Sequence, residues 1–367
     1  MSASLPEPDW FSRPGDSILS AMQRRGVSPS SLAERLPDGF AQLRELVAGT
    51  GRIDRNAANA IADAVGGSAD FWLRRQANYE RALERALAAV PGDEAEVWLE
   101  TIPAPGMKPR GKLDAQRRSA ELRRRLSFFG VGTLAAWHGR YGQERDRTLF
   151  RSSTAYHSEE GAVSLWLRQG ELEASLADTA VWDPAALKAR LPRIRKLSQV
   201  RHLERFLPKL RELLAESGVA LVVLRAPKEC KASGATRLIR PEKAMILLSF
   251  RHRSDDNFWF TVFHEIGHLL LHKTKAFVDG DETPENEHEA QANAFARSII
   301  IPETRQSEFQ ELTANYADIT RFAVSIGVAP GLVLGQLQHL GRVPRDRLSF
   351  LRRRWSWAQI EAAASSL

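Results

Sequence analysis

Residues 264–268 read His-Glu-Ile-Gly-His, a group of two imidazoles and a carboxylate that can hold a metal ion and move a proton. On a helix, His264 and His268 lie one turn apart on the same face, so both can bind a single zinc ion at about 2.0–2.1 Å. Glu265 points about 100° round the helix, where it can activate a water molecule and pass the proton to a leaving amine. The alternative is a core helix with two hydrogen-bonded histidines and no metal.

A catalytic zinc site needs a third protein ligand besides the two histidines. His272 continues the spacing, but it lies about 12 Å from the first histidine along a straight helix. We therefore expect it to be a helix cap or a substrate-side residue. The third ligand is expected on a second helix within residues 281–301, where alanines allow close helix packing. Glu289 begins that helix, and Glu285 and His288 are its rivals on spacing alone.

The segments around the motif are the elements that must hold it in place. Strand-length apolar segments occupy residues 219–224 and 244–250, and residues 236–239 are expected as a third strand. Asp255 and Asp256 are expected to cap a long helix that carries the motif between apolar flanks. Such an apolar shell excludes bulk water and holds ligands in position. The strand at 244–250 is expected to pair with an extended substrate segment through main-chain hydrogen bonds.

The first part of the chain is expected to be entirely helical. Turn residues and caps divide residues 1–90 into short helices, with Ser68 as one of the caps. Short helices joined by tight turns are typical of a helix-turn-helix domain. Prolines and glycines make residues 91–112 irregular, and amphipathic helices follow. We therefore predict an α+β protein in three parts: a helix-turn-helix domain at 1–90, a linker and helical middle region at 91–215, and a domain with a small sheet at 216–367.

A cluster of arginines stands in the helix expected at residues 113–129. One interpretation is a surface for an acidic partner or for nucleic acid, and the alternative is a solvated helix face. The cluster consists of Arg117, Arg118, Arg123, Arg124 and Arg125.

The composition narrows the class of protein. The chain has 367 residues with a formal net charge of +7, and its 43% hydrophobic and 26% charged residues are typical of a globular protein rather than a disordered one. No apolar run approaches the roughly 18–20 residues of a membrane span, and Glu7 and Asp9 stand where a signal peptide has basic residues. A single cysteine, Cys230, excludes an intrachain disulfide and a cysteine-based zinc site. We therefore expect a cytoplasmic protein with no membrane partner.

The motif and the residues that follow it resemble the ImmA/IrrE family of zinc metallopeptidases. The resemblance covers roughly residues 216–345 and rests on residues 258–272, on residues 289–296, which read Glu-Ala-Gln-Ala-Asn-Ala-Phe-Ala, and on Pro302. It implies a zincin-like domain whose small sheet packs on the motif helix. It also implies one zinc ion and a catalytic base, with His264, His268 and Glu289 as the zinc ligands and Glu265 as the base.

The N-terminal part resembles the HigA-type branch of the XRE helix-turn-helix family. The resemblance rests on Pro-Gly at 14–15, on Leu-Ala-Glu-Arg-Leu at 32–36 and on an aromatic and basic segment at 71–79. It implies a DNA-binding domain.

The residues at the front of the expected recognition helix depart from that family. Phe40, Ala41 and Glu45 are poorly suited to reading base edges, which Arg, Asn and Gln do best. Gln42 and Arg44 are the remaining candidates for DNA contact. The segment has as many acidic as basic residues, so its attraction to phosphate is weak. The rival is a domain that no longer reads DNA and instead dimerises or docks onto another helix-turn-helix protein.

Together these features predict a zinc-dependent endopeptidase. By resemblance, its protein substrate is a helix-turn-helix transcriptional repressor, and cleavage relieves repression. The alternative is a DNA-binding transcriptional regulator, or an antitoxin-like protein, whose peptidase fold is a sensor rather than a catalyst. The expected partners are the protein substrate, DNA through residues 1–90 and a second copy of the chain.

Overall fold

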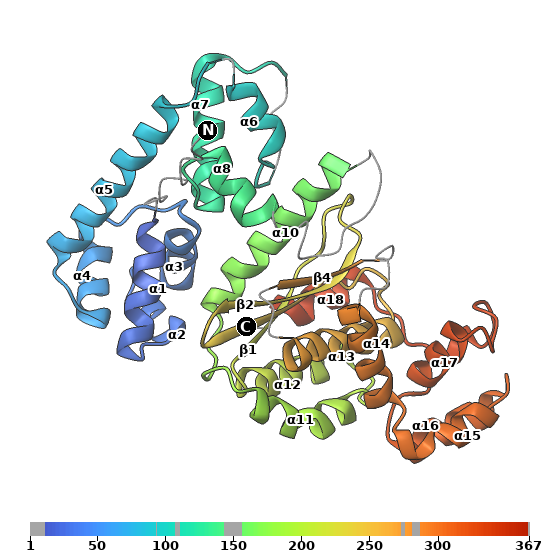
Figure 1. The fold of residues 1–367 in the computed structure, drawn as a ribbon. Coiled ribbons are helices and arrows are strands. Elements are labelled where there is room, and N and C mark those ends of the chain that lie inside the picture. The colour runs from blue at the N-terminus through green and yellow to red at the C-terminus, as the bar shows by residue number, and fades with distance from the viewer. Residues whose placement is uncertain are drawn as a thin grey trace, which may run out of the picture. The chain divides into compact units, whose positions relative to one another are not determined.

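The computed structural model describes residues 12–92, 94–106, 111–142, 156–272, 276–280 and 287–365. The chain divides into two compact units. The first comprises residues 1–146 and 154–178, and the second comprises residues 147–153 and 179–367. The described residues are mostly helical with one small mixed sheet (Figure 1), which is consistent with the predicted α+β class.

Helices make up the described part of the first unit. The prediction that Ser68 caps a helix is confirmed, because its side chain accepts a hydrogen bond of 3.1 Å from the N–H of Phe71. The elements are α1 (Pro14–Arg25), α2 (Pro29–Ala33), α3 (Gly39–Ala48), α4 (Arg55–Val65), α5 (Ala69–Ala88), α6 (Ala95–Thr101), α7 (Ala115–Phe129), α8 (Leu134–Trp137), the π-helix η1 (His138–Gly142) and α10 (Tyr156–Leu176).

One hydrophobic core joins the helices of the first unit from α1 to α10. Its buried members run from Ile18 to Leu176. The packing divides the chain into compact units near residue 178, because α6 to α10 share a core with the first helices. The three predicted domains stay a prediction.

Two buried arginines support this core at the C-terminal end of α7. The guanidinium of Arg13 donates to the carbonyl oxygens of Ser127 and Phe128 at 3.4 and 3.3 Å, and that of Arg168 donates to the Phe128 oxygen at 2.9 Å. Cations stabilise this end of a helix, where backbone carbonyls lack helical partners. Arg13 and Arg168 thus tie α1 and α10 to α7.

The arginine cluster of α7 is neutralised within the first unit. Arg124 and Arg125 both pair with Glu121 at 2.8 Å, and Arg118 pairs with Glu96 at 3.2 Å. The other two pairs are Arg117 with Asp114 and Arg123 with Glu84. This pairing favours the interpretation of the cluster as a helix face over that of a surface for an acidic partner.

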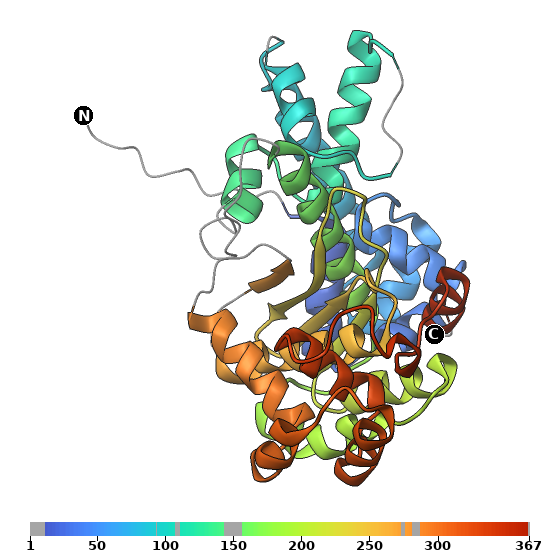
Figure 2. The ribbon, with the colours of Figure 1, turned by 90° about the vertical axis from the view of Figure 1, so that its right-hand side faces the viewer.

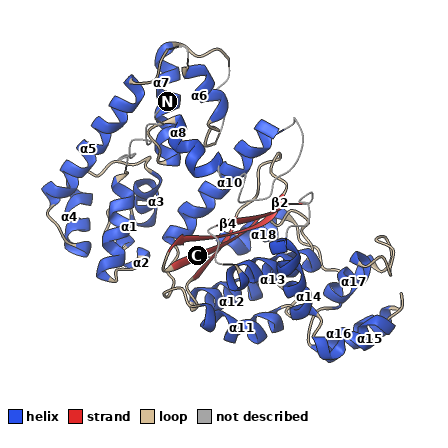
Figure 3. Ribbon diagram, viewed as in Figure 1, coloured by secondary structure: helices blue, strands red, loops and turns tan. Residues whose placement is uncertain are grey.

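The second unit contains all the described strands (Figure 3). The sheet has the order β1-β3-β2-β4, in which β1 and β3 are parallel and β2 is antiparallel to both of its neighbours. The strands are β1 (Val219–Val223), β2 (Ala232–Arg240), β3 (Lys243–Leu248) and β4 (Ala276–Gly280).

The expectation that the strand at 244–250 pairs with substrate is wrong. This strand is β3, which lies between β1 and β2 and pairs with both through its backbone. A strand with partners on both sides has no row of backbone groups to offer a peptide. The edges of the described sheet are β1 and β4.

A long helix, α13 (Asp255–Leu271), is the centre of the second unit. It packs against β2, β3, α14 and α17, and it lies below the strands in both views (Figures 1 and 2). The other helices are α11 (Pro184–Leu197), α12 (Leu203–Ala215), α14 (Glu287–Ile300), η2 (Glu303–Arg305), α15 (Gln306–Glu311), α16 (Tyr316–Ile326), α17 (Pro330–His339), η3 (Ser349–Leu351) and α18 (Trp357–Ser365).

No single described helix is long and apolar enough to cross a membrane. By length and composition alone, α16 and α17 together could span one, and this pair is bent by 115°.

The start of α13 is fixed by the C-terminal segment of the chain. Its N-cap is Ser254, and Asp255 and Asp256 stand in the first turn rather than at the predicted cap position. The buried Asp255 carboxylate accepts a 3.0 Å hydrogen bond from the N–H of Arg353, and Asp256 pairs with Arg352 at 2.8 Å. These contacts hold the metal-motif helix at the end opposite to the histidines.

Candidate metal centre

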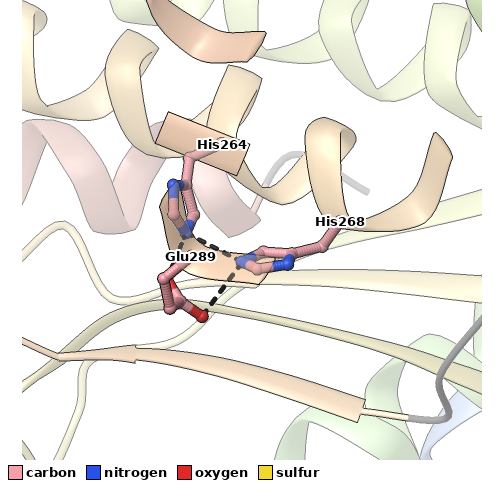
Figure 4. Close-up of side chains that lie close together, drawn as sticks. All are labelled: His264, His268 and Glu289. Carbon is pink, nitrogen blue, oxygen red and sulfur yellow. Dashed lines mark hydrogen bonds and ion pairs between the residues drawn. The ribbon is translucent and has the colours of Figure 1, made fainter. Parts of the chain in front are cut away.

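Two helices bring together three side chains that could hold a metal ion in the second unit (Figure 4). His264 and His268 extend from α13, and Glu289 extends from the first turn of α14. The Nε2 atoms of the two histidines are 2.9 Å apart. Glu289 Oε2 lies 3.2 Å from His264 Nε2, and Glu289 Oε1 lies 3.3 Å from His268 Nε2.

These distances fit a small, tetrahedrally bound cation. For zinc with bonds of about 2.0–2.1 Å, neighbouring ligand atoms of a tetrahedron are about 3.3 Å apart. The set of two imidazole nitrogens and one carboxylate oxygen is one that catalytic zinc sites use, with a fourth position left for water or substrate. All three side chains are buried. The cluster is therefore suited to bind a metal ion.

The protonation states of the cluster also favour a cation. Burial by itself would raise the pKa of Glu289, but its contacts with His264 and His268 lower that pKa to about 2. Burial lowers the pKa of His268 to about 4. At neutral pH the carboxylate is therefore ionised and the His268 imidazole is uncharged, which are the forms that bind metals.

The two histidine rings are held from behind by further side chains. Nδ1 of His264 lies 3.0 Å from Asn293 Oδ1, and Nδ1 of His268 lies 3.1 Å from Nδ1 of His272. Hydrogen bonds of this kind fix the tautomer and the orientation of a metal-binding imidazole. Sequence reasoning missed Asn293, although its position four residues after Glu289 places it on the same face of α14.

His272 is the C-cap of α13, as one of its two predicted roles requires. Its backbone N–H donates to the carbonyl oxygen of His268 at 3.1 Å. Its ring is not a member of the three-residue cluster and contacts the ring of His288, with centroids 4.4 Å apart. The rival ligand His288 thus lies behind the site, and the other rival, Glu285, lies outside the described residues.

Glu265 is completely buried against strand β2. A Cβ atom built on Gly234 of that strand would lie 2.3 Å from Glu265 Oε1 and 2.6 Å from Thr261 Cγ2. Neither distance is sterically allowed, so only glycine at this position leaves room for the carboxylate. The Thr236 hydroxyl, also on β2, donates to the main-chain oxygen of Glu265 at 3.3 Å. Sequence reasoning missed Gly234, because nothing in its local sequence marks what it faces.

The two candidate DNA contacts lie on α3 of the first unit. The guanidinium of Arg44 forms an ion pair of 3.1 Å with Glu173 of α10. The side-chain oxygen of Gln42 accepts from the N–H of Asp38 at 3.4 Å. Both residues are therefore engaged within the unit, and their role in DNA binding stays a prediction.

Comparison with known proteins bears on the second unit. No curated protein matches the chain. The cluster of His264, His268 and Glu289 is compatible with a metallopeptidase. Residues 218–331, which contain the cluster, match the IrrE N-terminal-like domain, Peptidase_M78, and this match supports a metallopeptidase of the ImmA/IrrE type.

Proposed function

We propose that this protein is a zinc-dependent endopeptidase whose active site consists of His264, Glu265, His268 and Glu289. The observation that carries the proposal is the spacing of 2.9 to 3.3 Å among the ligand atoms of three buried side chains, next to a fully buried glutamate. A metal cluster with only a structural role would not require the Glu265 carboxylate next to its ligands in the sequence. It would also not require a glycine at position 234 to leave room for that carboxylate.

Each residue has a distinct role in the proposed reaction. His264, His268 and Glu289 would hold the metal, and a zinc ion bound there would supply a Lewis acid for the carbonyl of the scissile peptide bond. Glu265 accepts a proton from the water molecule that attacks the carbonyl carbon. It then delivers this proton to the amine nitrogen as the C–N bond breaks. The protein interior around Glu265 excludes bulk water and keeps the carboxylate in place.

The substrate is proposed to bind as an extended segment along β4. Among the described strands, β4 pairs with β2 alone, so its other side carries backbone donors and acceptors without a strand partner. An extended peptide can add to such an edge through main-chain hydrogen bonds. In the chain, β4 comes between α13 and α14, the two helices that carry the metal ligands.

By resemblance to ImmA/IrrE proteins, we propose that the substrate is a helix-turn-helix transcriptional repressor. Cleavage would then relieve repression. Support comes from the family match at residues 218–331 and from the resemblance of the N-terminal segment to a helix-turn-helix family, which would suit contact with a related repressor.

The Glu265→Gln variant tests the proposed function. We expect it to bind zinc as the wild type does and to cleave at least about 100-fold more slowly, because the amide cannot accept the proton. The full chain and the variant are each co-expressed with candidate repressors, and fragments are identified by mass spectrometry. Equal fragment patterns, or equal effects on a reporter gene, would favour the alternative of a regulator without catalysis.

A further inference from the structure

We propose that Glu287, Gln291 and His272 form a hydrogen-bond relay that orients His268 and directs its Nε2 lone pair at the metal. The relay rests on the proposed metal site. Gln291 Nε2 donates to Glu287 Oε1 at 3.2 Å, and Gln291 Oε1 lies 3.0 Å from His272 Nε2. Nδ1 of His272 lies in turn 3.1 Å from Nδ1 of His268.

The carboxylate at the outer end fixes the direction of every bond in the relay. Because the Glu287 carboxylate only accepts, the amide of Gln291 must present its NH2 group to Glu287 and its oxygen to His272. A neutral His272 must then donate from Nε2 and accept at Nδ1. A neutral His268 consequently carries its proton on Nδ1, and its Nε2 atom presents a lone pair to the cluster.

The other histidine ligand is oriented in a simpler way. Asn293 Oδ1 accepts directly from His264 Nδ1 at 3.0 Å, so this ring also presents its Nε2 lone pair. Glu289 Oε2 lies 3.2 Å from His264 Nε2, and Glu289 Oε1 lies 3.3 Å from His268 Nε2. Three electron-rich groups at these distances repel one another unless a cation lies among them. The hydrogen bonds outside the cluster therefore prepare it for a metal ion.

Helix α14 supplies most of this arrangement. It provides the proposed ligand Glu289, the acceptor Asn293 and the two outer members of the relay. The backbone of His272 is extended, with φ −116° and ψ 127°, so α13 ends there and the residue is not bound to helical geometry. His272 thus acts through His268 as a positioning residue and is not itself a ligand.

Zinc affinity measured on the full chain by competition with a chromophoric chelator tests the relay. We expect His272→Ala to weaken zinc binding about 10- to 100-fold, as loss of such outer partners does in other metal sites. His272→Asn should recover most of the affinity, because an asparagine Oδ1 can stand near the position of Nδ1 and accept from His268. Gln291→Leu should weaken binding in the same direction by less.

A histidine of the same unit outside the relay is the matched control. His339 contacts Arg297 and no member of the cluster, so His339→Ala should bind zinc as tightly as the wild type. Far-ultraviolet circular dichroism of the metal-free proteins shows whether each variant is folded. If His272→Ala fails to fold, the comparison of His272→Asn and Gln291→Leu with the wild type decides the question.

The outcomes separate the relay from the proposed function. If the wild type itself takes up no zinc, the proposed metal site is wrong, and the relay with it. If the wild type binds zinc and the folded His272→Ala variant binds it equally well, the relay alone is wrong. Equal losses of zinc affinity in His272→Ala and His272→Asn would also overturn the relay. They would show that a hydrogen-bond acceptor for His268 at position 272 does not influence zinc binding.

Discussion

At the scale of single residues, the position of the proposed base Glu265 depends on the lack of a side chain at Gly234. Gly234 faces Glu265 across the boundary between β2 and α13, and a methyl group there would lie 2.3 Å from the carboxylate oxygen. The terminal atoms of a glutamate can move away from such a group, whereas the backbone of two packed elements cannot easily do so. A substitution at Gly234 is therefore expected to move the Glu265 carboxylate and to leave the backbone fold unchanged.

This leads to a prediction for Gly234→Ala. We expect peptide cleavage to fall about 10²- to 10⁴-fold, as when general-base catalysis is lost, while zinc affinity stays at the wild-type value. Cleavage is measured by mass spectrometry on a peptide library, and zinc affinity by chelator competition. Gly92→Ala is the control, because a Cβ atom at Gly92 meets no other atom within 4 Å. A variant at Gly234 that cleaves normally would contradict the placement of the base.

The residues of the site differ in how far the sequence could predict them. His264 and His268 follow from the helical repeat, since a spacing of four residues places two rings on one face. Glu289 is one of three candidates on spacing, and the family resemblance singles it out. Gly234 and Asn293 act through contacts between separate elements, which no local pattern encodes.

At the scale of elements, the first turn of α13 contains a buried carboxyl group, Asp255, whose ionised form is unfavourable in the folded chain. Burial raises the pKa of Asp255 from 3.8 to about 7, and the neighbouring Asp256 adds to the effect. The folded chain therefore holds a proton at Asp255 that the unfolded chain releases between these pH values. As the pH rises from about 4 to about 7, Asp255 ionises in the unfolded chain but not in the folded chain, and the free energy of unfolding falls. Above pH 7 both states are ionised, and the free energy of unfolding falls no further on account of Asp255.

We therefore predict that Asp255→Asn gains stability relative to the wild type as the pH rises. The amide oxygen can still accept from the N–H of Arg353, so the variant loses the buried charge and keeps a hydrogen bond. The measurement is urea unfolding of both proteins at pH 5 and pH 8. In the difference between the unfolding free energies of the variant and the wild type, the contributions of all other titrating groups cancel. A difference that is the same at both pH values would show that Asp255 is ionised throughout this range.

The order of the strands shows what a strand pattern cannot predict. The apolar segments at 219–224 and 244–250 become β1 and β3, and the short strand expected at 236–239 lies within β2. A strand-length apolar segment indicates which residues are buried, but not which strands become neighbours. The strand expected to bind substrate is consequently central, and the edges of the described sheet are β1 and β4, of which no sequence pattern marks β4.

At the scale of the whole molecule, ion pairs within the first unit neutralise many of its arginines. The sequence shows an arginine-rich helix, but two of its partners, Glu84 and Glu96, come from two other helices that only the fold brings close. Glu121, which pairs with Arg124 and Arg125, lies one turn away on the same helix. The same holds for Arg44, whose partner Glu173 is 129 residues away. Charge counted along a sequence therefore overstates the basic surface of the first unit.

We accordingly predict weak and non-specific DNA binding by the full chain. The exposed residues of α3 are Phe40, Ala41, Arg44 and Glu45, and the guanidinium of Arg44 is paired with Glu173. Fluorescence anisotropy with random duplexes and duplexes from candidate promoters, each at two salt concentrations, measures this. Binding to one sequence about 10³-fold more tightly than to random DNA, lost in Arg44→Ala, would show that the first unit is a specific reader.

The most direct test of the central claim is anomalous X-ray diffraction at the zinc absorption edge, from crystals of the full chain grown with zinc. The account predicts one zinc peak in the second unit, bonded at about 2.0–2.2 Å to His264 Nε2, His268 Nε2 and a carboxylate oxygen of Glu289. A map without zinc at this cluster, or with zinc held by other side chains, would contradict it.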